Sequence, residues 1–299
     1  MRASEFEEKE YEHPLCSQLE FSTREFWPPG QVLENYLGFD RGLFLTAAYL
    51  WDLHGIRQPF RGVVPFSEYW PFLPRVAPHR HRLPSFRLNC FIQVKRCRVG
   101  RRLRKELAAL GSARPFYRFD VDAEQQRVLD AAAGALTGRA LFVYAAPVFS
   151  ESAKLFLLQQ QGQLVENSTF PDIRTLSGHR AWYYNEPGAT GVVNQDYEFS
   201  EAPPFTERVT ALISSVADGA TTPESENLMS LSRSLQSSML QLDPDTGSVR
   251  TAYLIGDWRS IARYAERYDL PPAGRAFLEV HAFARRLNME WFAVADRGV

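Results

Sequence analysis

The sequence predicts an α/β fold, with a mixed sheet flanked by helices in the N-terminal two-thirds and a mainly helical C-terminal region. Three observations predict it. Residues 86–95 alternate between apolar and polar side chains, residues 140–146 form a continuous apolar run, and several helical patterns follow residue 204. Period-two alternation and short apolar runs are typical of strands, whereas apolar residues three and four apart are typical of helices. A chain that mixes both in this way is expected to be α/β.

The first 85 residues carry weak local signals. Residues 1–12 are acidic and polar, which favours a loose tail. Ser22 and Glu25 have capping-box spacing, but Pro28 and Pro29 would end any helix there quickly. Beyond them we expect a short helix that Gly38 ends, then a strand, then a long irregular connection rich in proline and arginine. These three segments span residues 31–37, 39–45 and 55–84.

The clearest predicted strand is Phe86 to Lys95. Its residues alternate between two rows: Phe86, Leu88, Cys90, Ile92 and Val94 in one, and Arg87, Asn89, Phe91, Gln93 and Lys95 in the other. Because side chains two apart leave the same face of a strand, Gln93 and Lys95 share a face. Residues 100–111 are expected to form a short basic helix.

The next predicted segment is a helix followed by a strand. Asp122 is a good N-cap, with Gln125 three residues later, for a helix that runs to about Leu136. Residues 140–146 then predict a strand buried on both faces, ending at Pro147. A second helix is expected over residues 151–161, where Gly162 ends it.

The second half of the chain is predicted to be mostly helical. A strand at 181–184 and a turn marked by Gly188 and Gly191 precede a helix over 205–217. Residues 218–224 resemble a linker, so we divide the chain into domains 1–217 and 218–299. Helices are expected at 224–240, 258–268 and 271–287. Apolar residues such as Leu228, Leu231 and Leu235 share one helix face, which must pack on the same chain or on a partner or second copy.

Basic residues are concentrated in one segment. The whole chain has a net charge of −1, yet residues 71–105 contain eleven Lys or Arg and no Asp or Glu. A block of one sign within an otherwise acidic chain suits contact with a phosphate backbone. It can also be a solvated face. The nucleic-acid-binding candidates within it are Arg96, Arg98, Arg101, Arg102, Arg104 and Lys105.

The N-terminus and the cysteines indicate a cellular compartment. The first thirteen residues are too polar for a secretory signal, and no apolar run is long enough to span a bilayer. Cys16, Cys90 and Cys97 are an odd number in a large chain and fit reduced thiols. We therefore expect a cytoplasmic protein.

Gln93 and Lys95 also indicate a chemistry. Hydrolysis of a phosphodiester bond uses carboxylate oxygens that hold Mg²⁺, a neutral amide oxygen that completes the shell, and an ammonium that orients water or stabilises developing charge. Gln93 and Lys95 supply the last two. Glu34 lies on the predicted helix and Asp40 at the start of the next strand.

This combination resembles the PD-(D/E)XK nuclease superfamily. The elements that carry the resemblance are Glu34, then Gly38-Phe39-Asp40, then Phe91-Ile92-Gln93-Val94-Lys95-Arg96, and it covers roughly residues 20 to 165. The Gln is typical of the Mrr-like restriction endonucleases, which use it in place of the acidic residue of the (D/E)XK element. Residues 116–120 and 139–147 also resemble a group of bacterial proteins with the same Q-x-K-R element.

The resemblance implies a restriction-endonuclease-like sheet and a metal-dependent endonuclease acting on DNA, with a role in restriction or antiphage defence. It implies Mg²⁺ or Mn²⁺ held by Glu34, Asp40 and Gln93, with Lys95 and Glu34 as catalytic residues. Asp52 is an alternative to Asp40, since the stretch before Gln93 is long. RNA as substrate stays open. The competing interpretation is a non-catalytic nucleic-acid-binding or assembly subunit built on a degenerate nuclease fold.

Two other sites have little support in the sequence. His79 and His81 with Cys90 and Cys97 do not have the spacing of a common zinc site. Ser177, His179 and Asp172 would need a nucleophile elbow, which the sequence lacks.

Overall fold

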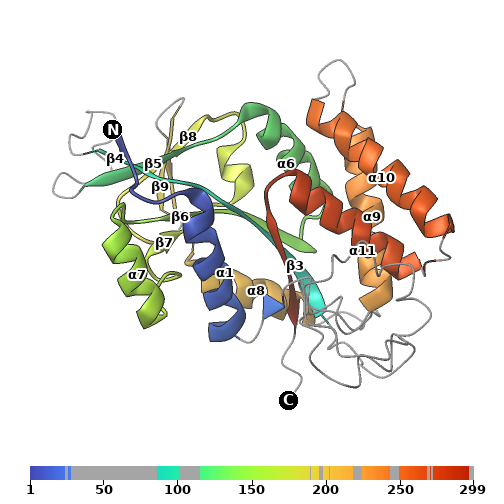
Figure 1. Cartoon of the computed structure of the whole chain (residues 1–299), viewed down its shortest axis with the longest axis horizontal. Helices are drawn as coiled ribbons and strands as arrows, with labels where there is room; N and C mark the ends of the chain where they lie inside the picture. The colour runs from blue at the N-terminus through green and yellow to red at the C-terminus, as the bar shows by residue number, and fades with distance from the viewer. Residues whose placement is uncertain are drawn as a thin grey trace, which may run out of the picture.

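A computed structural model describes residues 1–23, 26–27, 86–100, 115–188, 190–194, 198–201, 203–217, 224–242, 249–267, 270 and 272–295. Within these ranges the fold is mixed α/β, with helices around two sheets (Figure 1). The strands are β1 (Arg2–Ala3), β2 (Phe26–Trp27), β3 (Phe86–Val94), β4 (Arg98–Gly100), β5 (Phe116–Asp120), β6 (Ala140–Pro147), β7 (Ser168–Thr169), β8 (Ala181–Tyr184), β9 (Gly191–Val193), β10 (Phe199–Ser200) and β11 (Glu290–Ala295). The helices are α1 (Glu8–Thr23), α6 (Ala123–Ala135), α7 (Ser152–Gln161), η3 (Ile173–Leu176, a 3₁₀ turn), α8 (Phe205–Ala217), α9 (Glu224–Leu240), α10 (Val249–Arg267) and α11 (Pro272–Arg286).

The described strands make two sheets with different topologies. One has the order β1-β4-β5-β8-β9-β10, with antiparallel neighbours throughout. The other has the order β2-β11-β3-β6-β7 and is mixed. In it β3 runs parallel to β6, with Gln93 beside Tyr144, and antiparallel to β11, with Ile92 beside Glu290. The predicted strands at 86–95 and 140–146 are therefore confirmed as neighbours at the centre of the mixed sheet.

Helix boundaries follow the local signals on which they were predicted. The Asp122 carboxylate accepts a hydrogen bond from the backbone N–H of Gln125 at 2.7 Å, which satisfies one of the unpaired donors at the start of α6. Helix α7 ends at Gly162, whose φ of 64° is the left-handed conformation that favours glycine. Both predicted helices are confirmed.

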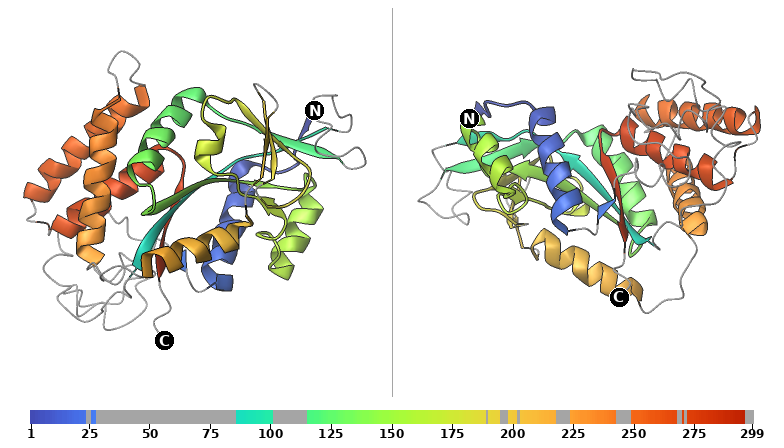
Figure 2. Two further views of the ribbon diagram at one scale, coloured as in Figure 1. Left: turned by 180° about the vertical axis from the view of Figure 1, so that it is seen from behind. Right: turned by 60° about the horizontal axis from the view of Figure 1, so that its bottom comes forward.

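Each face of the mixed sheet carries its own hydrophobic core. Cys90, Ile92 and Val94 of β3 pack with α1, α7 and α8. Phe91, on the opposite face, packs with α6, α9, α10 and α11, and stacks on Phe142 with ring centroids 4.6 Å apart. Helices α9 to α11 lie at one end of the molecule and the antiparallel sheet at the other (Figure 2). Because helices cover both of its faces, the mixed sheet is the middle layer.

The N-terminal segment differs from its prediction. A loose tail over residues 1–12 is wrong, because β1 pairs with β4 and α1 begins at Glu8. Tyr11, Leu15 and Leu19 recur at helical spacing and are completely buried. Ser22, which has capping-box spacing with Glu25, lies in the last turn of α1 and does not begin a helix.

The C-terminal region shares the sheet and core of the rest of the chain. Leu228, Leu231 and Leu235 are at most 1% exposed and belong to the same core as Phe91. The apolar face of α9 is thus covered by this chain itself. Beyond the predicted helices, β11 forms a strand between β2 and β3. The division at residue 218 stays a prediction.

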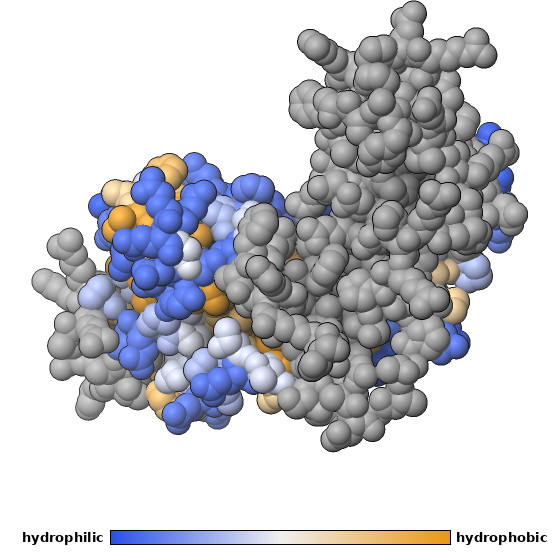
Figure 3. Space-filling view, turned by 90° about the horizontal axis from the view of Figure 1, so that it is seen from below, coloured by the Kyte–Doolittle hydropathy of each residue, from blue (hydrophilic) through white to orange (hydrophobic). Residues whose placement is uncertain are grey.

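Several predicted elements lie outside the described residues: the helix at 31–37, the strand at 39–45, the connection at 55–84, and the basic helix at 100–111 beyond Gly100. None of the helices in the described ranges is both long and apolar enough to cross a bilayer. Seen from below, the described surface is mostly hydrophilic with small apolar patches (Figure 3).

Candidate functional site

Gln93 and Lys95 lie at the carboxyl end of β3, on the face covered by α6 and α11. The other predicted metal or catalytic residues, Glu34 and Asp40, and the alternative Asp52, lie outside the described residues. Gln93 and Lys95 are thus the part of the predicted site whose surroundings can be read.

The orientation of the Gln93 side chain is fixed by a backbone carbonyl. Gln93 is 1% exposed, and its Nε2 donates to the carbonyl oxygen of Leu287 at 3.0 Å. Nε2 of Gln125 donates to the same oxygen at 2.6 Å. A carbonyl only accepts hydrogen bonds, so the nitrogen of Gln93 must face Leu287 and the amide oxygen must point elsewhere.

The amide oxygen of Gln93 is buried and has no hydrogen-bond partner among the described residues. Leaving a buried acceptor unpaired costs about 1–3 kcal/mol, so such atoms are uncommon and call for an explanation. A cation or a hydrogen-bond donor in contact with this oxygen would remove the cost.

Lys95 follows β3 directly and is half-buried. Its Nζ lies 5.5 Å from the centroid of the Tyr144 ring, a distance at which the ring attracts the cation. Burial lowers the pKa of Lys95, Arg250 lowers it further, and Glu8 and Asp122 oppose the shift. Within the described part of the chain, the ammonium has no hydrogen bond or ion pair. The charge is therefore held close to an aromatic surface with its donors unfilled.

Tyr144 connects this end of the strand to α6. Its hydroxyl donates to Oε1 of Gln126 at 2.5 Å, and Nε2 of Gln126 donates to the carbonyl of Ile173 and to Asp130, both at 2.8 Å. Burial raises the pKa of Tyr144 well beyond its usual range, so the phenol stays neutral. This network holds the ring on which the Lys95 ammonium rests.

Two carboxylates act on Lys95 electrostatically, and each has another partner. Glu8 accepts a hydrogen bond from the backbone N–H of Arg96 at 3.2 Å. Asp122 caps α6 and lies 3.7 Å from Arg250. The described residues contain no group of three or more His, Cys, Asp or Glu that could hold a metal ion. The predicted carboxylate ligands, Glu34 and Asp40 or Asp52, lie outside the residues that were searched.

Arg96 and Arg98, both predicted to bind nucleic acid, have different surroundings. The Arg96 guanidinium donates to Glu7 at 2.7 Å and to the hydroxyl and carbonyl oxygens of Ser4 at 3.1 and 2.6 Å. These contacts hold the N-terminal segment against β3 and use three of the five N–H donors of Arg96. Arg98 is 58% exposed, and its Nε lies 3.7 Å from Oδ2 of Asp120, so it forms a long ion pair at the surface. The remaining predicted contacts, Arg101, Arg102, Arg104 and Lys105, lie outside the described residues.

Of the two sites with little support in the sequence, the zinc candidate cannot be compared as a whole because His79 and His81 lie outside the described residues, and the Ser177, His179 and Asp172 set is not assembled. The Ser177 hydroxyl donates to Asp130 at 2.9 Å, while the Asp172 carboxylate pairs with Arg174 and Arg208. Cys90 and Cys97 are buried, and burial raises the pKa of both thiols, that of Cys97 to about 12. Such thiols are poor metal ligands and nucleophiles.

The sequence did not indicate the roles of Tyr144, Gln125, Gln126 and the Leu287 carbonyl. Two adjacent glutamines, Gln125 and Gln126, in the first turn of α6 were a signal in the sequence for part of this network.

Comparison of the chain with protein-family models, with curated proteins and with solved structures gave no match.

Proposed function

We propose that this protein is a metal-dependent nuclease that hydrolyses phosphodiester bonds of DNA, with Mg²⁺ or Mn²⁺ as cofactor. One observation carries the proposal. The buried Gln93 amide oxygen and the Lys95 ammonium lie two residues apart on one face of β3, and both lack hydrogen-bond partners among the described residues. A neutral oxygen ligand beside a cation is the pair expected at the end of a Q-x-K strand in a nuclease site.

The arrangement of the sheet supports a restriction-endonuclease-like fold as the finer proposal. β3, which carries the pair, runs parallel to β6 after the chain has passed through α6, and antiparallel to β11 on its other side. Helices cover both faces of this sheet. A mixed sheet with a helix between two parallel strands agrees with the core that the resemblance implies.

The Gln93 oxygen fits a divalent ion, because it is a hard, neutral donor whose direction is set by Leu287. Glu34 and Asp40 would complete the protein ligands. A bound Mg²⁺ or Mn²⁺ would lower the pKa of a water molecule and polarise the phosphate.

Lys95 acts through its charge. In a half-buried position an ammonium interacts more strongly with an anion than it would in water. It can hold the attacking water or stabilise charge that develops on the phosphate oxygens. Arg98 and the basic residues that follow it would hold the neighbouring phosphates. A role in restriction or antiphage defence follows from the resemblance alone, whereas a cytoplasmic location follows from the polar N-terminus and the cysteines.

The test is cleavage of plasmid DNA with Mg²⁺, with Mn²⁺ and with EDTA. We expect wild-type protein to cleave only with metal, and Lys95→Met, Asp40→Ala and Glu34→Ala to lose at least about a hundred-fold in rate. Lys154→Met is the matched control, since Lys154 also lies over an aromatic ring, at 5.9 Å from Phe149, but on α7. Full activity in folded Lys95→Met would contradict the proposal.

The competing function, a non-catalytic nucleic-acid-binding or assembly subunit, is favoured by a different observation. The Gln93 and Gln125 amides both bind the Leu287 carbonyl, so Gln93 also serves to hold the end of α11. That use of the amide needs no metal. Under this function the wild-type protein binds DNA but does not cleave it with any divalent ion.

The basic block is expected to bind DNA under both functions. Neutralising Arg98, Arg101, Arg102 and Lys105 together should reduce the slope of log affinity against log salt by about 0.9 for each DNA phosphate that the variant no longer neutralises. Fluorescence anisotropy with duplexes of two unrelated sequences measures this. An unchanged slope would show that the block serves another purpose.

A further inference from the structure

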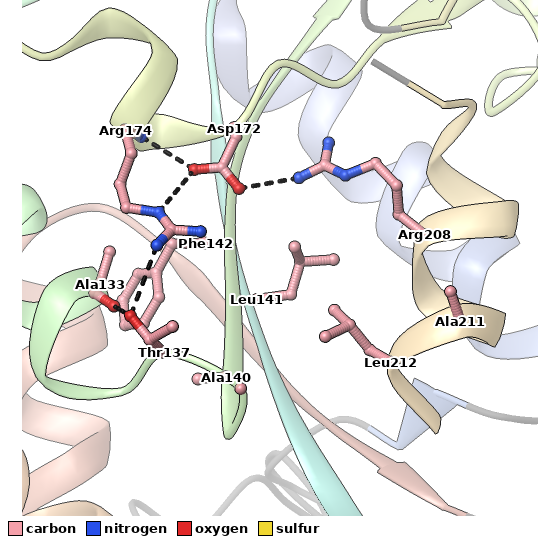
Figure 4. A pocket seen from close by; sticks show the side chains of 11 residues that line it. Ala133, Thr137, Ala140, Leu141, Phe142, Asp172, Arg174, Arg208, Ala211 and Leu212 are labelled. Carbon is pink, nitrogen blue, oxygen red and sulfur yellow. Dashed lines mark hydrogen bonds and ion pairs between the residues drawn. The ribbon is translucent and has the colours of Figure 1, made fainter. Parts of the chain in front are cut away.

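A second candidate site lies away from Gln93 and Lys95. A cavity of about 280 Å³ opens between α6, the start of β6, η3 and α8. Figure 4 shows Asp172 between Arg174 and Arg208 at one end, with Leu141 and Leu212 below them. The remaining walls are mainly apolar. Further lining residues are Ala133, Thr137, Gly138, Ala140, Phe142 and Ala211.

The charged end of the cavity has two guanidinium groups for one carboxylate. Nη2 of Arg208 donates to Oδ2 of Asp172 at 3.0 Å, and its Nη1 donates to the Phe170 carbonyl at 2.8 Å. The other oxygen of Asp172 accepts from the backbone N–H of Arg174 at 2.9 Å, with Nε of Arg174 at 3.5 Å. Asp172 is thus shared between both arginines.

A neighbouring carboxylate, Asp130, does not balance this charge within the cavity. Its oxygens accept from Ser177 and Gln126, and it does not line the cavity. The described lining residues, with two arginines and one aspartate, therefore carry one net positive charge.

Arg208 makes that surplus charge significant. Its side chain is only 11% exposed, and a buried cation is stable only when it is paired. Burial lowers the pKa of Arg208, while Asp172 opposes the shift. Nη1 of Arg174 also donates to the Thr137 hydroxyl at 3.4 Å (Figure 4). Each guanidinium has five N–H donors, so the two together still have more donors than these acceptors fill. An anion placed in the cavity would fill donors and balance the charge.

We propose that this cavity binds a small organic anion, with a carboxylate or phosphate-monoester head group at Arg174 and Arg208 and an apolar body against Leu141, Phe142 and Leu212. The volume is close to the lower limit of ordinary ligand pockets, about 300 Å³, so the body is about the size of one aromatic ring. The site is independent of the nuclease function.

Calorimetric titration of the full chain with four probes tests the site. Benzoate and phenyl phosphate carry both features, benzamide lacks the charge, and inorganic phosphate lacks the apolar body. We expect at least one of the first two to bind at least ten-fold more tightly than benzamide, which lacks the charged head group, and than inorganic phosphate, which lacks the apolar body. The preferred one of the two identifies the head group. Equal affinity for all four, or no binding at millimolar concentration, would overturn the proposal.

Two variants locate the binding. Arg174→Gln removes one of the two guanidinium groups at the head group, so it should weaken binding at least ten-fold. Because Arg174 is half-exposed and the pair of Arg208 and Asp172 stays in place, the variant should fold. Arg180→Gln, an exposed arginine outside the cavity, is the control and should bind as wild type does. Ala211→Phe fills the apolar part without changing a charge and should abolish binding. Undiminished binding in both Arg174→Gln and Ala211→Phe would show that the anion binds elsewhere.

Discussion

On one face of β3, Cys90, Ile92 and Val94 are completely buried among apolar side chains of α1, α7 and α8. On the opposite face Asn89 accepts a hydrogen bond from Trp291, Phe91 is stacked between aromatic rings, and the row ends with Gln93 and Lys95. The two rows of side chains alternate along the same strand, yet only the first is entirely apolar, as a stable core requires. Polar groups that a core does not need, left without partners, indicate a function.

The largest effect should come from the apolar face. Ile92→Ala removes buried methyl and methylene groups at the centre of the sheet, so we expect the free energy of unfolding to fall by about 2–5 kcal/mol. Ile92→Val, the control, should cost about 0.5–1.5 kcal/mol. Urea unfolding followed by circular dichroism measures both. A loss below about 1 kcal/mol in Ile92→Ala would show that this face does not stabilise the fold as described.

A substitution on the polar face should not lower the free energy of unfolding. Burial lowers the pKa of Lys95 in the folded chain below its value in the unfolded chain, so the buried cation reduces stability at neutral pH. Lys95→Met should therefore leave the free energy of unfolding at pH 7 unchanged or raise it by up to about 1 kcal/mol.

The pH dependence gives a check on this sign. As the pH rises through the lowered pKa of Lys95 toward its ordinary value of about 10.4, the wild type loses the buried charge and its stability approaches that of Lys95→Met. Urea unfolding at pH 7 and pH 10 compares them. A variant that is less stable than wild type by about 2 kcal/mol or more at pH 7 would show that Lys95 has a structural role.

The smallest effect is expected beside the apolar face, at Glu12 of α1. Burial raises the pKa of Glu12, Lys9 opposes the shift, and Glu290 and Glu8 add to it. Its ionised form is therefore costly in the folded chain at neutral pH. Glu12→Gln should gain about 0.5 kcal/mol at pH 7, since the exposed Lys9 partner contributes little.

Acidification should reduce this gain. As the pH falls from the raised folded pKa toward the unfolded value of about 4.3, the wild type takes up a proton in the folded state and becomes more stable relative to Glu12→Gln. Thermal unfolding at pH 7 and pH 4 tests it. A difference that grows on acidification would contradict the assigned direction of the pKa shift.

The elements that could be predicted from the sequence are those with a local cause. The Asp122 cap, the Gly162 stop and the alternation along β3 each depend on residues within a few positions of one another. The pairing of Gln93 with the Leu287 carbonyl joins residues 194 positions apart and uses a backbone atom, which no side-chain pattern records. β11 was missed for a related reason, because a short apolar segment becomes a strand only beside β3.

The loose tail was predicted because residues 1–12 are acidic and polar, and the helical spacing of Tyr11, Leu15 and Leu19 and the presence of Pro14 were not considered. Burial of that face against the sheet offsets the cost of a proline within the helix. The nucleic-acid role predicted for Arg96 likewise took no account of Ser4 and Glu7, which reach it from the N-terminal segment.

The central claim is that the Gln93 amide oxygen is a metal ligand, and calorimetric titration with Mn²⁺ tests it most directly. Gln93→Met and Gln125→Met each remove one amide from the same Leu287 carbonyl, so they perturb the fold in matched ways. We expect Gln93→Met to lose at least about ten-fold in Mn²⁺ affinity while Gln125→Met binds as wild type does. Equal affinity in all three proteins, each folded, would contradict the claim and leave Gln93 as a structural link to α11.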